Sequence, residues 1–198
     1  MDEAALIKKA QNGDLAAFNR LVLAYQEAVY NVAYRIMGEP QSAEDATQEA
    51  FISAYNALKR FRGGSFKSWL MRIATNSCYD ELRRRKRRPQ TSLERITDEN
   101  ESFAFLRSPE DGPEQAQQRF ELVRAIEDCL QSLPDDQRIT AVLGDVEGFN
   151  YQEIAGMTGV SLGTVKSRMS RARVKLRDCL QGVKELLPAS YRLTTDTR

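Results

Sequence analysis

The sequence predicts an all-α protein: two small helical domains joined by an acidic, flexible linker, with a helix-turn-helix in the C-terminal domain. Apolar residues recur at helical spacing through most of the 198 residues, and no run alternates as a strand would. Residues 90–113 are rich in acids, Ser, Pro and Gly, which is typical of linkers. Residues 150–177 combine helix caps, a turn glycine and an apolar stripe.

These changes of pattern along the chain predict the domain boundaries. We expect a first domain at residues 1–90, a linker at 91–113, a second domain at 114–183 and a flexible tail at 184–198.

Helices of the first domain are marked by caps and breakers. The first substantial helix opens at Gly13-Asp14 and stops at Gly38 and Pro40. Ser42, followed three residues later by Asp45, has the pattern of a cap for the next helix. A third helix is expected from about residue 65 or 66 to about 88.

The helix-turn-helix is predicted from consecutive signals. Asn150 can cap a helix with Glu153 reaching back, Gly159 can end that helix, and Ser161 can cap the next. The second helix has one apolar face, formed by Val165, Met169, Ala172 and Leu176. Its other face carries Lys166, Ser167, Ser170, Arg171, Arg173 and Lys175. Such a helix suits the DNA major groove, and the alternative is a helical hairpin with a solvated basic face.

Charge is divided unevenly along a chain whose net charge is only +1. Residues 1–93 carry a net charge of +5 and residues 94–113 a net charge of −4. Six bases and no acid lie between Lys166 and Arg177. This order suggests two lobes that face nucleic acid, joined by an acidic connector.

A second basic cluster, Arg83 to Arg88, ends the third predicted helix. Cations attract phosphate, and flat rings can stack on unpaired bases. Aromatic and amide side chains precede the run, namely Phe61, Phe66, Trp69, Asn76 and Tyr79. Together they suit single-stranded or opening DNA. The alternative is a solvated Arg run with the rings in the core, and for Trp69 the core position is at least as good an interpretation.

One face of the second predicted helix is acidic and polar, with apolar residues beside it. It comprises Asp45, Gln48 and Glu49, with Phe51, Ile52 and Tyr55 nearby. A partner-binding surface and an ordinary solvated face both remain open on pattern alone.

Catalysis has little support in the sequence. There is no histidine, no Gly-rich phosphate loop and no nucleophile motif, so we expect no enzyme activity, cofactor or metal. Cys78, Cys129 and Cys179 are scattered and odd in number, so we expect ordinary or buried thiols rather than a zinc site or a disulfide. The N-terminal residues MDEAALIKK do not form a secretory signal, and the cytoplasm is the expected compartment.

Over residues 10–180 the chain resembles the extracytoplasmic-function (ECF) sigma factors of the sigma-70 family. The resemblance lies in an ordered set of motifs: GDLAAFNRLVLAYQEAVYNVAYRIMG, SAEDATQEAFISAYNALKRF, FKSWLMRIATNSCYDELRRRKRR, and LPDDQRITAVLGDVEGFNYQEIAGMTGVSLGTVKSRMSRARVKLR. It implies a subunit that acts with core RNA polymerase in promoter recognition and strand opening. It also implies promoter DNA and an anti-sigma factor as partners, and no small-molecule substrate.

The resemblance assigns roles to matching residues. Polymerase docking on the beta-prime clamp helices falls to Asp45, Gln48, Glu49, Phe51, Ile52 and Tyr55. Minus-ten recognition and melting fall to Arg60, Phe61, Arg62, Ser65, Phe66, Trp69, Arg72, Asn76, Arg83 and Arg84. Minus-35 recognition falls to Thr164, Lys166, Ser167, Arg168, Ser170, Arg171 and Arg173. Part of the second domain should touch the beta flap. The alternative function is a stand-alone helix-turn-helix regulator that binds duplex DNA as a dimer.

Overall fold

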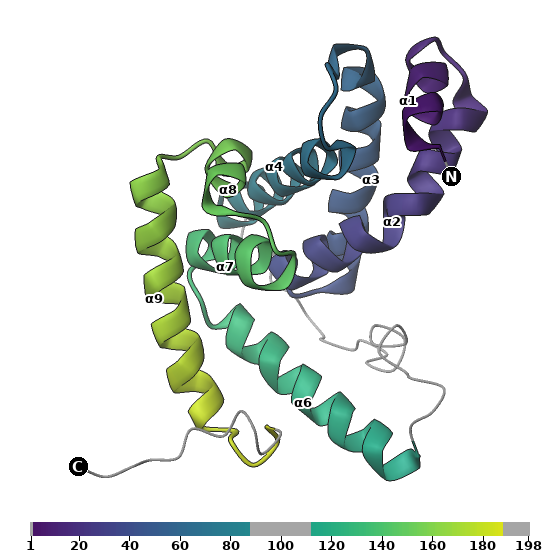
Figure 1. Cartoon of the computed structure of the whole chain (residues 1–198). Helices are drawn as coiled ribbons and strands as arrows, with labels where there is room; N and C mark the ends of the chain where they lie inside the picture. Colours follow the sequence, from purple (N-terminus) through teal and green to yellow (C-terminus); the bar gives the residue numbers. More distant parts are fainter. Residues whose placement is uncertain (1, 88–111, 188–198) are drawn as a thin grey trace.

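The computed structural model describes residues 2–87 and 112–187, and within these ranges all regular structure is helical (Figure 1). This confirms the predicted all-α class. The helices form a first lobe, α1 to α4, and a second lobe, α6 to α9. Most of the predicted linker and tail lies outside the described residues.

The first lobe is built around the long helices α2 and α4. Its elements are α1 (Glu3–Gln11), α2 (Leu15–Met37), α3 (Pro40–Ala57), the 3-10 turn η1 (Leu58–Arg60) and α4 (Phe66–Arg87). Their apolar faces meet in a core that includes the fully buried Leu21, Ile36, Leu58, Leu70 and Met71. Four small residues of α3, Ala43, Ala46, Ala50 and Ala54, are buried and let α3 approach its neighbours closely.

The second lobe holds the helix-turn-helix. Its elements are α6 (Pro113–Gln131), α7 (Asp135–Ala141), the π-helical segment η3 (Val142–Val146), α8 (Tyr151–Thr158) and α9 (Leu162–Gln181). Ile139, Leu143, Ile154 and Met169 are fully buried between them. The guanidinium of Arg138 is also buried, and it closes the α6–α7 turn by donating to the carbonyls of Gln131 and Leu133.

Two predicted helix starts in the first lobe differ from the structure. Helix α1, capped by the Asp2 side chain, precedes the first helix that the sequence indicated and buries Leu6, Ile7 and Ala10. Helix α3 starts at Pro40 rather than at Ser42, since proline already has the backbone angle that the first helical position needs. Ser42 lies inside the first turn, where it is buried and its hydroxyl donates to Glu39 instead of capping.

The lobes pack directly against each other, chiefly α4 on α8. Among the residues that the structure describes, three ion pairs cross the boundary. In the first, Nε of Arg35 lies 3.3 Å from Oε1 of Glu127. In the second, Nζ of Lys67 lies 3.1 Å from Oε2 of Glu147. Lys86 and Asp135 make the third, at 2.7 Å. The apolar residues of both lobes belong to one continuous cluster, so the two lobes share a core in this state.

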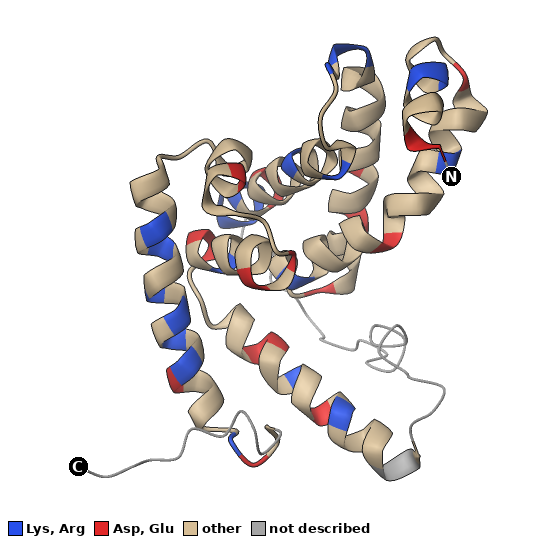
Figure 2. Cartoon of the chain, in the orientation of Figure 1, with Lys and Arg blue, Asp and Glu red and all other residues tan. Residues whose placement is uncertain are grey.

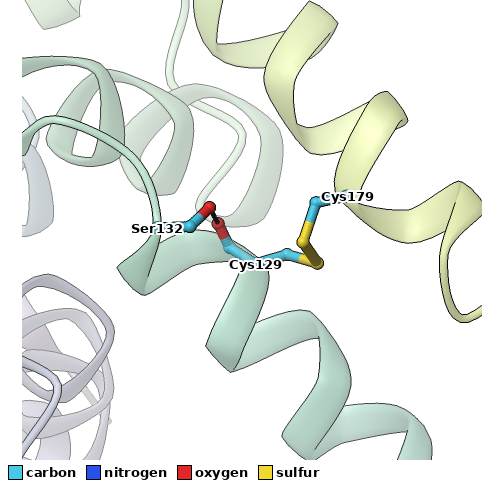
Figure 3. Close-up of a disulfide and its surroundings, with 3 residues drawn as sticks. All are labelled: Cys129, Ser132 and Cys179. Carbon is cyan, nitrogen blue, oxygen red and sulfur yellow. Dashed lines mark hydrogen bonds between the residues drawn. A yellow bond between two sulfur atoms is a disulfide. The ribbon is translucent and has the colours of Figure 1, made fainter.

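The prediction that no cysteines are bonded was wrong. Cys129 of α6 and Cys179 of α9 form a disulfide with an S–S distance of 2.06 Å and a Cα–Cα distance of 5.7 Å (Figure 3). They are 50 residues apart in the sequence, so they come together only because α6 and α9 pack against each other. The spacing of the cysteines in the sequence therefore could not predict the bond. Cys78 is a free, buried thiol, as expected. Burial raises its pKa to about 12.

Candidate nucleic-acid interface

The helix-turn-helix has the local structure that its sequence predicts. The Asn150 side chain accepts from the backbone of Gln152 and Glu153, and the Glu153 carboxylate reaches back to the Asn150 amide, which completes a capping box. Gly159 ends α8 with φ of 70°, in the left-handed region that favours glycine. Ser161 caps α9 by accepting from the Thr164 amide. Each of these signals acts within four residues, so sequence alone could predict them.

Helix α9 separates an apolar face from a cationic one, as Figure 2 shows by the row of Lys and Arg along it. Val165, Met169 and Ala172 are buried against the rest of the lobe. Lys166, Ser170 and Arg171 are exposed, while Thr164, Ser167 and Arg168 are partly buried. The exposed side chains lie on one face over two turns, where they can reach the edges and phosphates of a groove.

Two cations of α9 have acidic partners that sequence reasoning missed. Arg173 forms a forked contact with the Asp145 carboxylate, at 2.6 and 3.1 Å, and this hydrogen bond raises its pKa. Nε of Arg168 lies 3.0 Å from Oδ2 of Asp136. These aspartates lie in η3 and α7, far away in the sequence, so no local spacing signals the pairs. They hold Arg168 and Arg173 in place in the free protein.

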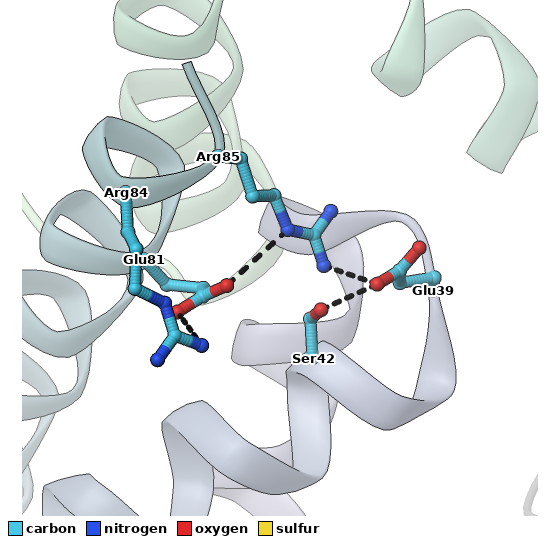
Figure 4. A network of polar contacts seen from close by, with 5 residues as sticks. All are labelled: Glu39, Ser42, Glu81, Arg84 and Arg85. Atoms are coloured by element: carbon cyan, nitrogen blue, oxygen red, sulfur yellow. Dashed lines mark hydrogen bonds and ion pairs between the residues drawn. The ribbon is translucent and has the colours of Figure 1, made fainter. Parts of the chain in front are cut away.

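The arginine run at the end of α4 is paired rather than merely solvated. Arg84 lies 2.6 Å from Glu81, and Arg85 bridges Glu81 and Glu39, to which Ser42 also donates (Figure 4). Arg85 thereby joins the end of α4 to the start of α3. Arg83 and Arg84 have exposed side chains, at 70% and 65%, so their pairs within the helix are weak and leave both free to turn to phosphate. Arg88 lies outside the described residues.

The loop before α4 and the aromatic residues around it form a half-buried platform. Arg60, Arg62 and Ser65 are exposed, and the rings of Phe61 and Trp69 are partly buried, with centroids 5.3 Å apart. Phe66 differs from the expectation of a DNA contact: it is only 2% exposed and packs beneath both rings. For Trp69 the structure lies between the two interpretations, since its side chain is partly buried and packs against the core.

Beside the packing contact of α4 with α8, a cleft of about 410 Å³ opens between α4 and the helix-turn-helix. Asn76, Tyr79, Asp80 and Arg83 line it from α4, and Thr158, Val160 and Arg168 line it from the second lobe. Burial raises the pKa of the Tyr79 hydroxyl, against the opposing effect of the neighbouring Arg168. Residues expected to contact the minus-ten element therefore face a residue expected to contact the minus-35 element.

The predicted polymerase-docking face lies along the outer side of α3. Asp45, Gln48 and Glu49 are exposed and Phe51 is partly buried. Ile52 and Tyr55 are large apolar side chains that are 57% and 40% exposed. Tyr55 stacks edge-on against Phe18 with ring centroids 5.0 Å apart, which holds it in position.

The described part of the chain contains neither a cluster of metal-ligating side chains nor a membrane-spanning helix. Within residues 2–87 and 112–187 no three acidic or thiol side chains come together in a way that could hold a metal ion. None of the described helices is long and apolar enough to cross a membrane.

The fold and this surface define a DNA-binding protein with two helical lobes, one of which carries a helix-turn-helix. Residues 21–88 match the family described as Sigma-70 region 2, and residues 123–176 match the family described as Sigma-70, region 4. The chain belongs to the sigma-70 family and is an RNA polymerase sigma factor of the ECF group. A stand-alone regulator is not favoured, because both regions are present in the order that the resemblance implied.

Full-length relatives agree with this assignment. The chain is 40% identical over 181 residues to the RNA polymerase sigma-H factor of Pseudomonas aeruginosa, which covers 89% of this chain and 92% of that protein. It is 36% identical over 183 residues to the ECF RNA polymerase sigma-E factor of Escherichia coli K12, covering 91% and 95%.

Two solved structures share the fold. The sigma factor RpoE from Bartonella quintana, in complex with the anti-sigma factor NepR, aligns with a TM-score of 0.62 and 28% identity, covering 82% of this chain and 96% of that one. CnrH in complex with the cytosolic domain of CnrY aligns with a TM-score of 0.63 and 26% identity, covering 92% and 99%.

Proposed function

We propose that this sigma factor reads the minus-35 element with α9 and reads and opens the minus-ten element with the first lobe. The observation that carries the proposal is the presence of two cationic surfaces on separate lobes. Lys166, Ser170 and Arg171 are exposed on α9, and Arg72, Asn76 and Arg83 are exposed on α4. Counterion release at both surfaces would supply affinity, while base contacts would supply sequence preference.

The packing of the lobes implies that they separate on the promoter. Asn76 and Tyr79 line the cleft opposite Thr158 and Arg168, so a DNA strand at Asn76 needs the space that α8 and α9 border. The ion pairs Lys67–Glu147 and Lys86–Asp135 across the boundary are partly exposed and therefore weak enough to exchange for polymerase and DNA contacts. The Arg35–Glu127 pair is mostly buried, so it would break only with a larger separation of the lobes. In the free chain, the second lobe would thus cover part of the surface proposed to bind the minus-ten element. That part would become accessible when the holoenzyme forms.

Docking on polymerase would use α3. Exposed Ile52 and Tyr55 beside acidic side chains form the mixed surface that suits a polar and apolar partner helix. We assign this face to the beta-prime clamp helices and part of the second lobe to the beta flap. The solved relative RpoE, which is bound to the anti-sigma factor NepR, favours an anti-sigma factor as a further partner. The protein would act in the cytoplasm through binding energy alone, without chemistry of its own.

Run-off transcription with purified core polymerase tests the proposal. The template is the promoter upstream of the protein's own gene, and the readout is a transcript that appears only when core and this chain are both present. No initiation on any promoter of the operons in its regulon would contradict the function.

Two substitutions test the division of labour between the lobes. Arg171→Ala should weaken minus-35 binding by roughly 1–3 kcal/mol if the side chain makes a good base contact. Asn76→Ala should leave duplex binding unchanged and slow strand opening, measured by permanganate reactivity of unpaired thymines. Equal loss of binding and opening in both variants would contradict separate roles.

Docking through α3 is tested by co-purification with core polymerase. Ile52→Ala and Tyr55→Ala should each weaken capture of the full chain by core. Leu23→Ala on α2 is the matched control, because Leu23 is 67% exposed and lies outside the predicted docking face. Equal effects of all three substitutions would argue against α3 as the docking surface.

A further inference from the structure

The disulfide covalently closes the DNA-reading unit. Cys129 lies in the last turn of α6 and Cys179 in the last turn of α9, and Figure 3 shows their sulfur atoms bridging the two helices. The intervening 50-residue separation contains α7, η3, α8 and nearly all of α9. The loop that this bond closes therefore contains α8, the turn and nearly all of α9, and no residue of the first lobe.

The C-terminal half of α9 has few other attachments. Beyond Ala172 no residue of the helix is fully buried, and only Leu176, Cys179 and Leu180 are even partly so. Val174 is 49% exposed, and Arg177 and Asp178 are exposed. The disulfide is thus a principal link that holds these last turns against α6.

The same end of α6 also contacts the first lobe. Glu127 pairs with Arg35, and Nε2 of Gln131 donates to the Arg35 carbonyl at 2.8 Å. Cys129 lies between Glu127 and Gln131, two residues from each. The disulfide consequently connects α9 to the turn of α6 that contacts α2. Without the disulfide, α9 would be held less firmly against this turn.

We propose that Cys129 and Cys179 are a reversible redox site that sets the order of the recognition helix, with the oxidised form the more competent at minus-35. The proposal rests on the proposed function, because that function places the protein beside polymerase in a reducing compartment. Disulfides there are usually transient and redox-sensing rather than permanent. Neither cysteine is part of the DNA-facing set, so oxidation leaves those side chains chemically unchanged.

The chemistry is thiol–disulfide exchange with a low-molecular-weight disulfide such as oxidised glutathione. The Cys179 thiolate, the more exposed of the two, attacks that disulfide and releases one small thiol, which leaves a mixed disulfide on Cys179. The Cys129 thiolate then attacks the Cys179 sulfur and releases the second small thiol. Two electrons pass to the small disulfide, and the two thiol protons end on the released thiols. Reduction reverses the steps, with a small thiolate attacking Cys179 first.

The first measurement follows the redox state of the full chain. Purified protein is equilibrated at ratios of reduced to oxidised glutathione, trapped by alkylation after unfolding, and weighed by mass spectrometry. We expect one alkylated cysteine, Cys78, in the oxidised form and three in the reduced form, with the change falling within ratios that cells maintain. If the pair stays oxidised at every such ratio, it is a permanent structural disulfide and the proposal is overturned.

The second measurement links the bond to order and activity. Reduction should speed hydrogen exchange in residues 173–181 and lower minus-35-dependent transcription about fivefold or more, the low end of typical coupling between sites. The double variant Cys129→Ser with Cys179→Ser should behave as the reduced protein under both conditions, and Cys78→Ser should respond as the wild type does. If wild-type protein shows the same exchange and activity in both states, the proposal is wrong, whether or not the double variant folds.

Failure of the proposed function gives a different result. If neither redox form supports initiation with core polymerase, the function is wrong, while hydrogen exchange of the wild-type chain still decides the redox proposal. Faster exchange on reduction would support redox control of the helix, and unchanged exchange would overturn it.

Discussion

Nζ of Lys67 in α4 lies 3.1 Å from Oε2 of Glu147 in the second lobe, and the same ammonium lies 5.5 Å from the centre of the Phe149 ring. This cation therefore attaches α4 to the segment that leads into the helix-turn-helix. The contact shows how the free sigma factor holds its two DNA-facing lobes together.

Glu147→Lys should open the two lobes. The substitution places two cations together where an ion pair and a cation–π contact now hold the boundary. We expect a larger radius of gyration in small-angle X-ray scattering, and a smaller difference from wild type at high salt because screening weakens the repulsion. Glu121→Lys is the control, because it makes the same charge change at an exposed position of α6 away from the boundary. Identical scattering of Glu147→Lys and wild type would show that the remaining contacts hold the lobes together without the Lys67–Glu147 pair.

Glu127 should make stability depend on pH. Burial raises the pKa of its carboxyl above 4.5 in the folded protein, although the Arg35 guanidinium partly opposes the shift. The folded state then binds the proton more tightly than the unfolded state does. This contribution to the free energy of unfolding is complete below the unfolded pKa and is lost as pH rises through the folded pKa.

Glu127→Gln removes the titration, so its urea-unfolding curve tests the sign. The free energy of unfolding of wild type minus that of the variant should fall as pH rises through that window. Asp80→Asn is the control, because the Asp80 side chain is 76% exposed. A difference that stays constant with pH would show that Glu127 does not titrate in this range.

Met169→Ala should destabilise the second lobe strongly. Met169 is 1% exposed and lies on the buried face of α9, beside Ile154 and Gly144. Deleting such a side chain costs about 2–5 kcal/mol through lost burial and the cavity left behind. Val174→Ala on the same helix should change stability by less than about 0.5 kcal/mol, since Val174 is half exposed. Chemical unfolding gives the free energy of unfolding of each variant. Equal losses for Met169→Ala and Val174→Ala would contradict the assignment of the buried face of α9.

Gly159→Ala should cost roughly 1–2 kcal/mol because a side chain is strained at its φ of 70°. No atom lies within 4 Å of the position of an added Cβ, so backbone strain rather than a clash produces the effect. Gly156→Ala inside α8 is the matched substitution and should stabilise by about 0.5–1 kcal/mol, since alanine suits a helix better than glycine. Thermal melting should show that Gly159→Ala lowers the stability of the protein and that Gly156→Ala raises it. A change of stability in the same direction for both variants would contradict the role of Gly159 in the turn.

Features that depend on neighbouring residues could be predicted from the sequence. The Asn150 capping box, the Gly159 turn and the buried stripe of α9 were all predicted correctly, because each signal spans a few residues. The short α1 was missed, although its Asp2 cap and the apolar Leu6, Ile7 and Ala10 are signals that could have found it. The functional assignments of the DNA-facing and docking side chains remain predictions.

Contacts between residues far apart in the sequence could not be predicted from the sequence. The Cys129–Cys179 bond was wrongly excluded, and the pairs Arg173–Asp145 and Arg35–Glu127 were not anticipated. Spacing along the chain carries no information about such pairs, since each depends on how whole helices pack. The burial of Phe66 beneath Phe61 and Trp69 is of the same kind.

By itself, the sequence determined the helical class, the helix-turn-helix and the placement of cations on α9 and at the end of α4. Helical periodicity, capping and charge runs are local properties, and the order of motifs already resembled the ECF sigma factors. Only the tertiary structure decided that the lobes share a core, that Asn76 faces Arg168 across a cleft, and that a disulfide closes the DNA-reading unit. Those outcomes follow from the packing of apolar faces, which brings together residues that no local pattern connects.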